Sequence, residues 1–382
     1  MSLSRRGFVR RFGQATAGTV TGTMLAARGF EDLVAARAAG QDRPEIPPGM
    51  IRLGSNENPY GPGPHVVAAV ERALHDDGNR YTRLPMLLTG RIASISSVSS
   101  GSVLLSAGSG DLLRAAVLAY VGPDKPLVAA TPTFETPLRT AESLRLPMRL
   151  VPLLPSLAND LERMTEQARG AGLLYVCNPD NPTGTFHARA AVVTLLDTIA
   201  RTSPDTVVMV DEAYCDCVDD ATYGSVVAIA VERRNVVVVR TFSKIHGLAG
   251  MRIGYAVAHP ETLDRMRHCA GSGVVACASA AAAMASLEDT DYFRRQQALN
   301  REARTRLMKA LTDLGYPPVP SQANFVMVDV RRDVRDFGSA CRALGVLVGR
   351  PFPPLATQAR ISFGTPDEMT RAIDVFGKVL RT

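Results

Sequence analysis

Short runs of β-branched and aliphatic residues alternate with longer runs rich in alanine and leucine through most of this sequence. Several short runs are apolar at every position, as expected for strands covered by helices on both faces. Two longer runs, residues 110–121 and 188–202, are candidate helices. The candidate strands are residues 102–107, 126–131, 173–177, 206–211, 235–241 and 255–258. This alternation predicts an α/β fold with a mostly parallel sheet sandwiched by helices.

The pattern changes at about residue 288. A long amphipathic run, residues 289–315, ends in a glycine that is soon followed by two prolines, which is typical of a helix end. After it come an apolar run at 324–330, a helical pattern near 334–344, a strand candidate at 359–365 and a closing helix from Asp367. We therefore expect a large domain, residues 76–287, a smaller α+β domain, residues 288–382, and an arm, residues 51–75, that joins the smaller domain.

The first 30 residues hold five arginines and no acidic residue, whereas the whole chain has a net charge of only +6. The sequence around Arg5 and Arg6 resembles a twin-arginine signal, and a weakly apolar stretch and small residues follow it. We expect residues 1–38 to be a signal peptide with a cleavage site at Ala38, residues 39–50 to be a linker, and the protein to be exported or periplasmic. The alternative is a basic tail that directs nothing and leaves the protein in the cytoplasm.

Composition argues against several classes of protein. The body of the chain is almost neutral, and tryptophan and basic runs interleaved with aromatic residues are lacking, so we expect no nucleic-acid partner. No later run approaches 18 apolar residues, so we expect no stable membrane anchor beyond the signal. The six cysteines lack the paired spacing of a zinc site, and we predict no metal. No disulfide is predicted, and the sequence leaves open whether any of the cysteines pair.

Lysine is rare in this chain: it occurs at four positions among 43 basic residues. An arginine can replace a lysine that serves only as a charge, but only lysine offers an amine that can lose its proton and form an imine. Lys244 lies in the sequence Thr-Phe-Ser-Lys, directly after the candidate strand 235–241. The other three lysines lie in a predicted turn or on predicted helices.

Other polar motifs also follow candidate strands, where ligands bind in open α/β sheets. The sequence AGSGD at 107–111 opens a helix whose N–H groups suit a phosphate, although an ordinary glycine turn is an alternative. The sequence CNPDNPTG at 177–184 is a rigid turn, and DEAY at 211–214 places a carboxylate at a strand end, where a helix cap is the alternative. Arg252 follows Lys244 by eight residues.

Together these motifs suit pyridoxal 5′-phosphate. Its aldehyde needs a lysine amine, its pyridine nitrogen needs a carboxylate, and its phosphate needs a helix N-terminus and a guanidinium. The motifs supply all four groups in one order along the chain.

The sequence also resembles the aminotransferases of pyridoxal-phosphate fold type I, class I/II, and among them the histidinol-phosphate aminotransferases. Besides the motifs above, the resemblance rests on LGSNENPYGPGP (53–64), NRYTR (79–83), PTFETP (132–137), TFSKIHGLAGMRIGYA (241–256) and VGRPFPPLATQARISFGT (348–365). It covers essentially the whole chain after residue 50.

The resemblance implies a role for each matching residue. Lys244 forms the Schiff base and moves the proton, Asp211 pairs with the pyridinium nitrogen, and Tyr214 sets the properties of the imine together with Asn181. Other cofactor contacts are implied for Tyr81, Ser109, Gly110, Phe134, Ser243 and Arg252. Arg360, assisted by Arg350, binds the substrate's carboxylate or phosphate. Because Tyr81 is implied to reach the cofactor of another subunit, the resemblance also implies a homodimer.

The leading interpretation is an aminotransferase that acts on a small-molecule amino donor, an amino acid or amino-alcohol phosphate, and a 2-oxo acid. A decarboxylase or lyase on the same scaffold is the first alternative, because the cofactor's reactivity depends on which Cα bond stands perpendicular to its ring. A non-catalytic cofactor-binding protein is the second alternative; such a protein would have no need of Lys244.

Overall fold

The computed structural model describes residues 46–271 and 275–381. The residues expected to form the signal and its cleavage site, 1–38, lie outside the described part, as do most residues of the expected linker. The chain divides at Met50–Ile51 into two compact units, and everything described below belongs to the unit Ile51–Thr382. No helix of the described residues is long and apolar enough to cross a membrane.

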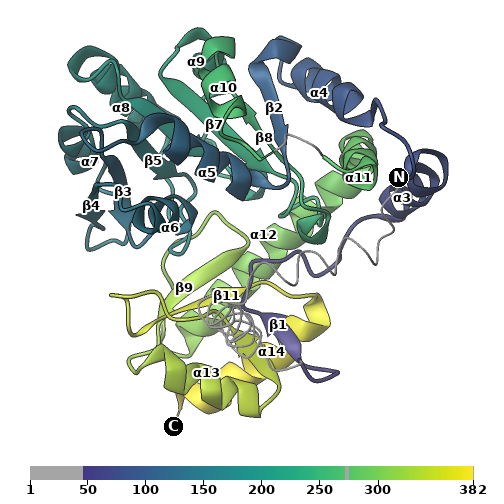
Figure 1. Cartoon of the computed structure of the whole chain (residues 1–382). Coiled ribbons are helices and arrows are strands. Elements are labelled where there is room, and N and C mark those ends of the chain that lie inside the picture. Colours follow the sequence, from purple (N-terminus) through teal and green to yellow (C-terminus); the bar gives the residue numbers. More distant parts are fainter. Residues whose placement is uncertain (1–45, 272–274, 382) are drawn as a thin grey trace, which may run out of the picture. The chain divides into compact units, whose positions relative to one another are not determined.

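A seven-stranded sheet has the order β2-β8-β7-β6-β5-β3-β4, and only β8 runs antiparallel to its neighbours (Figure 1). Its strands are β2 Val103–Ser106, β3 Leu127–Thr131, β4 Met148–Pro152, β5 Leu173–Cys177, β6 Val207–Asp211, β7 Val236–Thr241 and β8 Gly254–Val257. The predicted α/β architecture, with a mostly parallel sheet and a smaller second part, is confirmed.

Alternate residues of each central strand enter two separate cores, one on each face of the sheet. The first face is covered by α4 Leu84–Ile95, α7 Leu161–Gln167, α8 Arg189–Thr202, α9 Val227–Glu232 and α11 Cys277–Glu288. The second face is covered by α5 Ser109–Tyr120, α6 Thr136–Ser143 and α10 Pro260–Arg267. Burial on both faces explains why these strands are apolar throughout their length.

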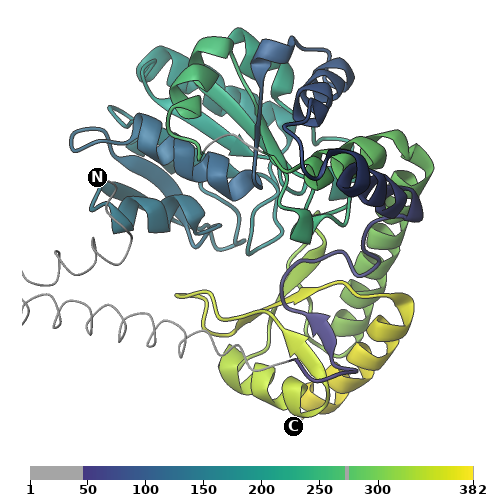
Figure 2. The same cartoon turned by 45° about the vertical axis from the view of Figure 1, so that its right-hand side comes forward.

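Two small sheets form a separate core at the C-terminal end of the chain. Strand β9 Phe325–Asp329 pairs antiparallel with β11 Gln358–Ser362, and β1 Ile51–Leu53 pairs parallel with β10 Val346–Val348. The helices of this part are α13 Val334–Ala343 and α14 Pro366–Leu380. The long helix α12 Thr290–Asp313 contacts β9 and α14 here and also the short helix η2 Cys215–Cys217 next to the large sheet. In both views α12 runs between the part with the large sheet and the part with the small sheets (Figure 2).

The residues expected to form the arm, 51–75, contribute to both parts of the fold. Strand β1 pairs with β10 of the small part, whereas helix α3 Pro64–Asp77 packs against α11 beside the large sheet. The chain between them, residues 54–63, therefore connects the two parts next to the strand ends where the polar motifs lie.

Candidate active site

Three consecutive parallel strands bring the polar motifs together. In the register of the sheet, Cys177 of β5 lies opposite Asp211 of β6, and Asp211 lies opposite Val239 of β7. The loops that follow these strands begin at one edge of the sheet and carry Asn181, Tyr214 and Lys244. The topology of the sheet thus gathers residues that are spread over more than 60 positions of the sequence.

Lys244 occupies a partly buried position beside the loop at residues 54–63. Its Nζ donates a hydrogen bond to the carbonyl of Asn56 at 3.2 Å and lies 5.3 Å from the ring centroid of Tyr214. Burial, and secondly the nearby positive charge of Arg360, lower the pKa of the Lys244 amine to about 8. A substantial fraction of this amine is therefore neutral near pH 8, as a nucleophile requires.

Asp211 ends β6 and is almost completely buried. Its Oδ2 accepts a hydrogen bond from the Tyr175 hydroxyl at 2.9 Å, and its Oδ1 accepts one from the backbone N–H of Ala213 at 3.1 Å. Burial raises the pKa of Asp211 to about 6, while these two hydrogen bonds and the charge of Lys244 oppose the increase. Asp211 is therefore a carboxylate at neutral pH.

Arg360 of β11 connects the small part of the fold to the loop after β5. Its Nη1 donates to Oδ1 of Asn181 at 2.6 Å, its Nη2 donates to the carbonyl of Gly54 at 2.8 Å, and its buried Nε has no partner. Burial, and then the charge of Arg350, lower the pKa of Arg360 to about 10. A buried cation with an unused donor is suited to bind an anion.

Tyr214 lies beside both Lys244 and Asn56. Its hydroxyl accepts a hydrogen bond from Nδ2 of Asn56 at 3.0 Å, and its ring packs edge-on against Phe325 of β9. Burial raises the pKa of the Tyr214 hydroxyl. The hydroxyl therefore keeps its proton and can donate a hydrogen bond to an oxygen anion.

A separate pocket lies at the N-terminus of α5. It is lined by Ala107, Gly110, Asp111, Arg114, Thr136, Arg252 and Gly271. No side chain caps α5, and its N-cap residue is Gly108, so N–H groups of the first turn are available to an anion. The Arg252 guanidinium lies close to the Cα of Gly108, and a Cβ at position 108 would overlap it. This cradle fits a phosphate group, as the motif predicts.

Ser109 begins α5 within this cradle, and Ser243, which follows β7, is buried. The backbone of Gly254 in β8 approaches the N–H of Ser109 so closely that no side chain fits between them. The Ser243 hydroxyl accepts a hydrogen bond from Thr241 at 2.9 Å. The strand end at Thr241 therefore positions Ser243 one residue before Lys244.

Two of the predicted site residues, Tyr81 and Arg350, lie in environments unlike those described above. The side chain of Tyr81 is fully exposed. The guanidinium of Arg350 forms an ion pair with Glu135 at 2.7 Å and stacks on the ring of Phe352, whose centroid lies 4.3 Å away. Phe134, next to Glu135, is partly exposed.

Sequence reasoning missed the hydrogen-bonding centre of the site, Asn56. Its carbonyl accepts from Lys244 and from Asn324, and its amide reaches Tyr214. It belongs to the motif at 53–64, and its left-handed φ of 54° is a signal that only a structure reveals. Tyr175 was also missed, because it lies inside a strand where an aromatic residue is ordinary.

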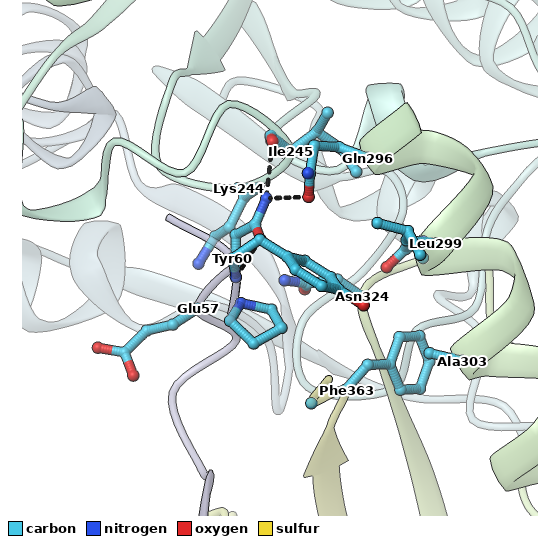
Figure 3. A pocket seen from close by; sticks show the side chains of 13 residues that line it. Glu57, Tyr60, Lys244, Ile245, Gln296, Leu299, Ala303, Asn324 and Phe363 are labelled. Carbon is cyan, nitrogen blue, oxygen red and sulfur yellow. Dashed lines mark hydrogen bonds between the residues drawn. The ribbon is translucent and has the colours of Figure 1, made fainter. Parts of the chain in front are cut away.

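Figure 3 shows a pocket that lies beside Lys244. Glu57 and Tyr60 come from the connecting loop, Gln296 and Leu299 from α12, and Asn324 precedes β9. Asn58 donates hydrogen bonds to the Ile245 carbonyl at 2.8 Å and to Gln296 at 3.1 Å, as the dashed lines mark (Figure 3). These bonds fix the loop that carries Lys244 against α12. 

The described residues contain no group of three or more histidine, cysteine or acidic side chains that could hold a metal ion. All six cysteines, which lie within the described ranges, are free thiols, and three of them are buried.

Comparisons with known proteins agree with this chemistry. The model of the family "Aminotransferase class I and II" matches residues 48–376. A histidinol-phosphate aminotransferase of Symbiobacterium thermophilum is 35% identical over 87% of this chain and 91% of its own length. An aromatic amino acid aminotransferase of Streptomyces avermitilis is 36% identical over 87% of this chain and 90% of its own length.

Solved structures give the same result. A putative histidinol-phosphate aminotransferase of Erwinia carotovora atroseptica superposes with a TM-score of 0.82 at 32% identity, over 86% of this chain and 95% of that one. The histidinol-phosphate aminotransferase of Sinorhizobium meliloti, solved in complex with pyridoxal 5′-phosphate, superposes with a TM-score of 0.79 at 28% identity, over 87% and 91%. The chain belongs to the class I and II aminotransferases, and it is a histidinol-phosphate aminotransferase-like, pyridoxal-phosphate-dependent enzyme.

Proposed function

We propose that this aminotransferase moves an amino group between an amino acid or an amino-alcohol phosphate and a 2-oxo acid. The observation that carries the proposal is the position of Lys244. A partly buried amine with a pKa of about 8 lies within one hydrogen-bonded cluster with Asn56 and Tyr214, near a carboxylate at Asp211 and a guanidinium at Arg360 that has an unused donor. Each group matches one requirement of amino-group transfer.

The residues present fit pyridoxal phosphate. When bound, the cofactor supplies an aldehyde that reacts with amines and a ring that accepts the electron pair left when a bond to Cα breaks. The cradle at Gly108, Ser109 and Arg252 would hold its phosphate, Asp211 its ring nitrogen, and Asn181 and Tyr214 its phenolic oxygen. Phe134, being partly exposed, is free to stack on the ring.

Side chains of the protein itself would transfer the proton, supply a fixed negative charge and orient the substrate. Because its pKa is about 8, the Lys244 amine can both accept and release a proton near neutral pH. Asp211 is ionised above pH 6 and supplies a fixed negative charge. Arg360 orients an anionic substrate group, with its guanidinium held at two of its nitrogens by Asn181 and Gly54.

The exposed surface of helices α3 and α4 supports the proposal that the protein is a homodimer. Large apolar side chains are exposed on α3 and α4 and between them, at Val67, Leu74, Tyr81, Met86, Leu87 and Ile95. Both helices pack on α11, so these side chains belong to neighbouring elements. A second copy of the chain would cover this surface, and Tyr81 would then reach the partner's cofactor phosphate.

We also propose that residues 1–38 direct export by the twin-arginine route and are cleaved after Ala38, with residues 39–50 as the linker. Support comes from the paired Arg5 and Arg6 and from the absence of acidic residues in the first 30 positions. Fusion of residues 1–50 to a reporter enzyme should send the reporter to the periplasm. Replacement of both arginines by lysine should keep it in the cytoplasm; a reporter that stays there with the native arginines would contradict the proposal.

The substrate class is tested by turnover. The purified protein with pyridoxal phosphate and a 2-oxo acid should convert at least one donor from a panel of amino acids and histidinol phosphate, with the new amino acid formed in equal amount. Release of carbon dioxide or ammonia without that amino acid would instead favour a decarboxylase or lyase.

A further inference from the structure

Glu135 faces the anion-binding arginines but belongs to the large part of the fold. It precedes α6 and follows Phe134. Its Oε1 forms an ion pair with Arg350 at 2.7 Å, and its Oε2 forms one with Arg139 at 2.5 Å. One carboxylate therefore bridges an arginine of the helix that follows it, α6, and an arginine of the loop between β10 and β11.

Arg350 and Arg360 form a single cationic pair. Both guanidiniums stack on the ring of Phe352, with their Cζ atoms 4.3 and 4.6 Å from its centroid. The charge of Arg350 lowers the pKa of Arg360, and the charge of Glu135 raises it, so the three groups interact electrostatically. Of the two arginines, Arg350 is thus paired with Glu135, whereas Arg360 has no ion-pair partner among the described residues.

We propose that Glu135 sets the charge preference of this anion site and makes an α-carboxylate, rather than a phosphate dianion, its preferred ligand. The proposal rests on the proposed function, because it assumes that Arg360 binds the substrate's anionic group. A carboxylate has one negative charge and is matched by Arg360 alone. A phosphomonoester has nearly two at neutral pH and needs a second free guanidinium.

A phosphomonoester can use Arg350 only after Glu135 has released it. Glu135 then keeps its bond to Arg139, so the carboxylate is never left without a partner. The detachment and the repulsion between Glu135 and the phosphate both reduce affinity for the phosphomonoester. The substrate class assigned by this arrangement is therefore the amino acids, in preference to amino-alcohol phosphates.

The test compares two donors in the wild type and in Glu135→Gln, with L-phenylalanine as the carboxylate donor and histidinol phosphate as the phosphomonoester. The measured quantity is the ratio of kcat/KM for the phosphomonoester to kcat/KM for the amino acid. Loss of one negative charge should raise this ratio about three- to tenfold. The increase should shrink below pH 6, where the phosphomonoester becomes a monoanion, whereas a general structural effect would not follow the phosphate's charge.

A second variant moves the ratio in the opposite direction. Arg139→Gln removes the alternative partner of Glu135, strengthens its attachment to Arg350, and should lower the ratio. Glu261→Gln removes a comparable exposed ion pair with Arg234 at 2.9 Å, remote from the site in α10, and should leave the ratio unchanged.

An unchanged or lower ratio in Glu135→Gln would overturn the inference, as would an increase in Arg139→Gln. Should Glu135→Gln fail to fold, the Arg139→Gln result decides alone. Failure of the wild type to transaminate any donor would overturn the proposed function itself, which is a distinct outcome.

Discussion

Arg360 Nη1 and Asn181 Oδ1 lie 2.6 Å apart, although one belongs to the small sheet and the other to the loop after β5. The bond joins the group expected to hold the substrate's anion to one expected to hold the cofactor's phenolic oxygen. A change in either partner should therefore affect both substrate and cofactor.

Arg360→Lys should lower kcat/KM about 30-fold, because a lysine ammonium cannot make both the Asn181 and the Gly54 bonds while binding an anion, at a cost of about 2 kcal/mol. Steady-state kinetics with the best donor measure the change. Arg331→Lys is the matched control: Arg331 also donates to a glycine carbonyl and stacks on an aromatic ring, but on the exposed surface. Equal losses in both variants would contradict the assignment of Arg360.

Lys244→Arg should abolish turnover, since a guanidinium stays protonated and forms no imine with the cofactor. Circular dichroism should show an intact fold. Lys309→Arg, which alters an exposed ion pair with Asp313 on α12, should keep full activity. Measurable turnover in Lys244→Arg would refute the role of this lysine.

Asp211 should make the cofactor-free protein less stable as the pH rises from about 4 to 6. Its pKa is raised to about 6 in the folded state, so the folded protein binds more protons than the unfolded chain in this range, and the free energy of unfolding falls with pH. Two pKa units correspond to about 3 kcal/mol. Asp211→Asn should remove this dependence in urea unfolding.

Tyr175→Phe tests the same dependence of stability on pH. It removes a hydrogen bond that lowers the pKa of Asp211, so the loss of stability should extend to higher pH. A loss of stability confined to lower pH in Tyr175→Phe would contradict the role assigned to this hydroxyl.

Gly108→Ala should weaken cofactor binding about tenfold or more, because the new Cβ would displace the Arg252 guanidinium. Fluorescence titration with pyridoxal phosphate measures the Kd. Gly170→Ala is the matched control: Gly170 also has a positive φ, of +69°, but its Cβ would meet open space. It should lose stability by about 1 kcal/mol and keep its cofactor affinity. Equal affinities in the two variants would contradict the cradle.

Leu87→Glu should convert the proposed homodimer into a monomer, because it places a charge on the exposed apolar surface of α4. Sedimentation velocity distinguishes the two states. Leu344→Glu changes a leucine of similar exposure after α13 and should leave the dimer intact. A wild-type monomer would refute the homodimer and the role of Tyr81 across subunits.

The sequence predicts the buried strands well because their pattern depends on burial alone. Residues 173–177 coincide with β5, and residues 206–211 differ from β6 by one position. The strand β4 at Met148–Pro152 was missed, since it is the last strand of the sheet and has partly exposed side chains without an apolar run.

The sequence identifies a site residue only where that residue lies within a recognisable motif. Lys244 and Asp211 follow strands within recognisable motifs, but nothing near Glu135 in the sequence indicates that it pairs with Arg350, 215 positions away. The contacts of Asn56 with Tyr214 and Asn324 likewise depend on the packing of the small part against the large one. Such contacts are set by tertiary structure rather than by local pattern.

Lys244 and its surroundings, we propose, carry out amino transfer on bound pyridoxal phosphate. The absorption spectrum of the purified protein with the cofactor, before and after addition of an amino donor without a 2-oxo acid, tests this role. We predict a yellow protein whose visible band is lost as pyridoxamine phosphate forms, and whose colour returns when a 2-oxo acid is added. A protein that binds no cofactor, or whose bound cofactor no donor converts, would contradict the claim.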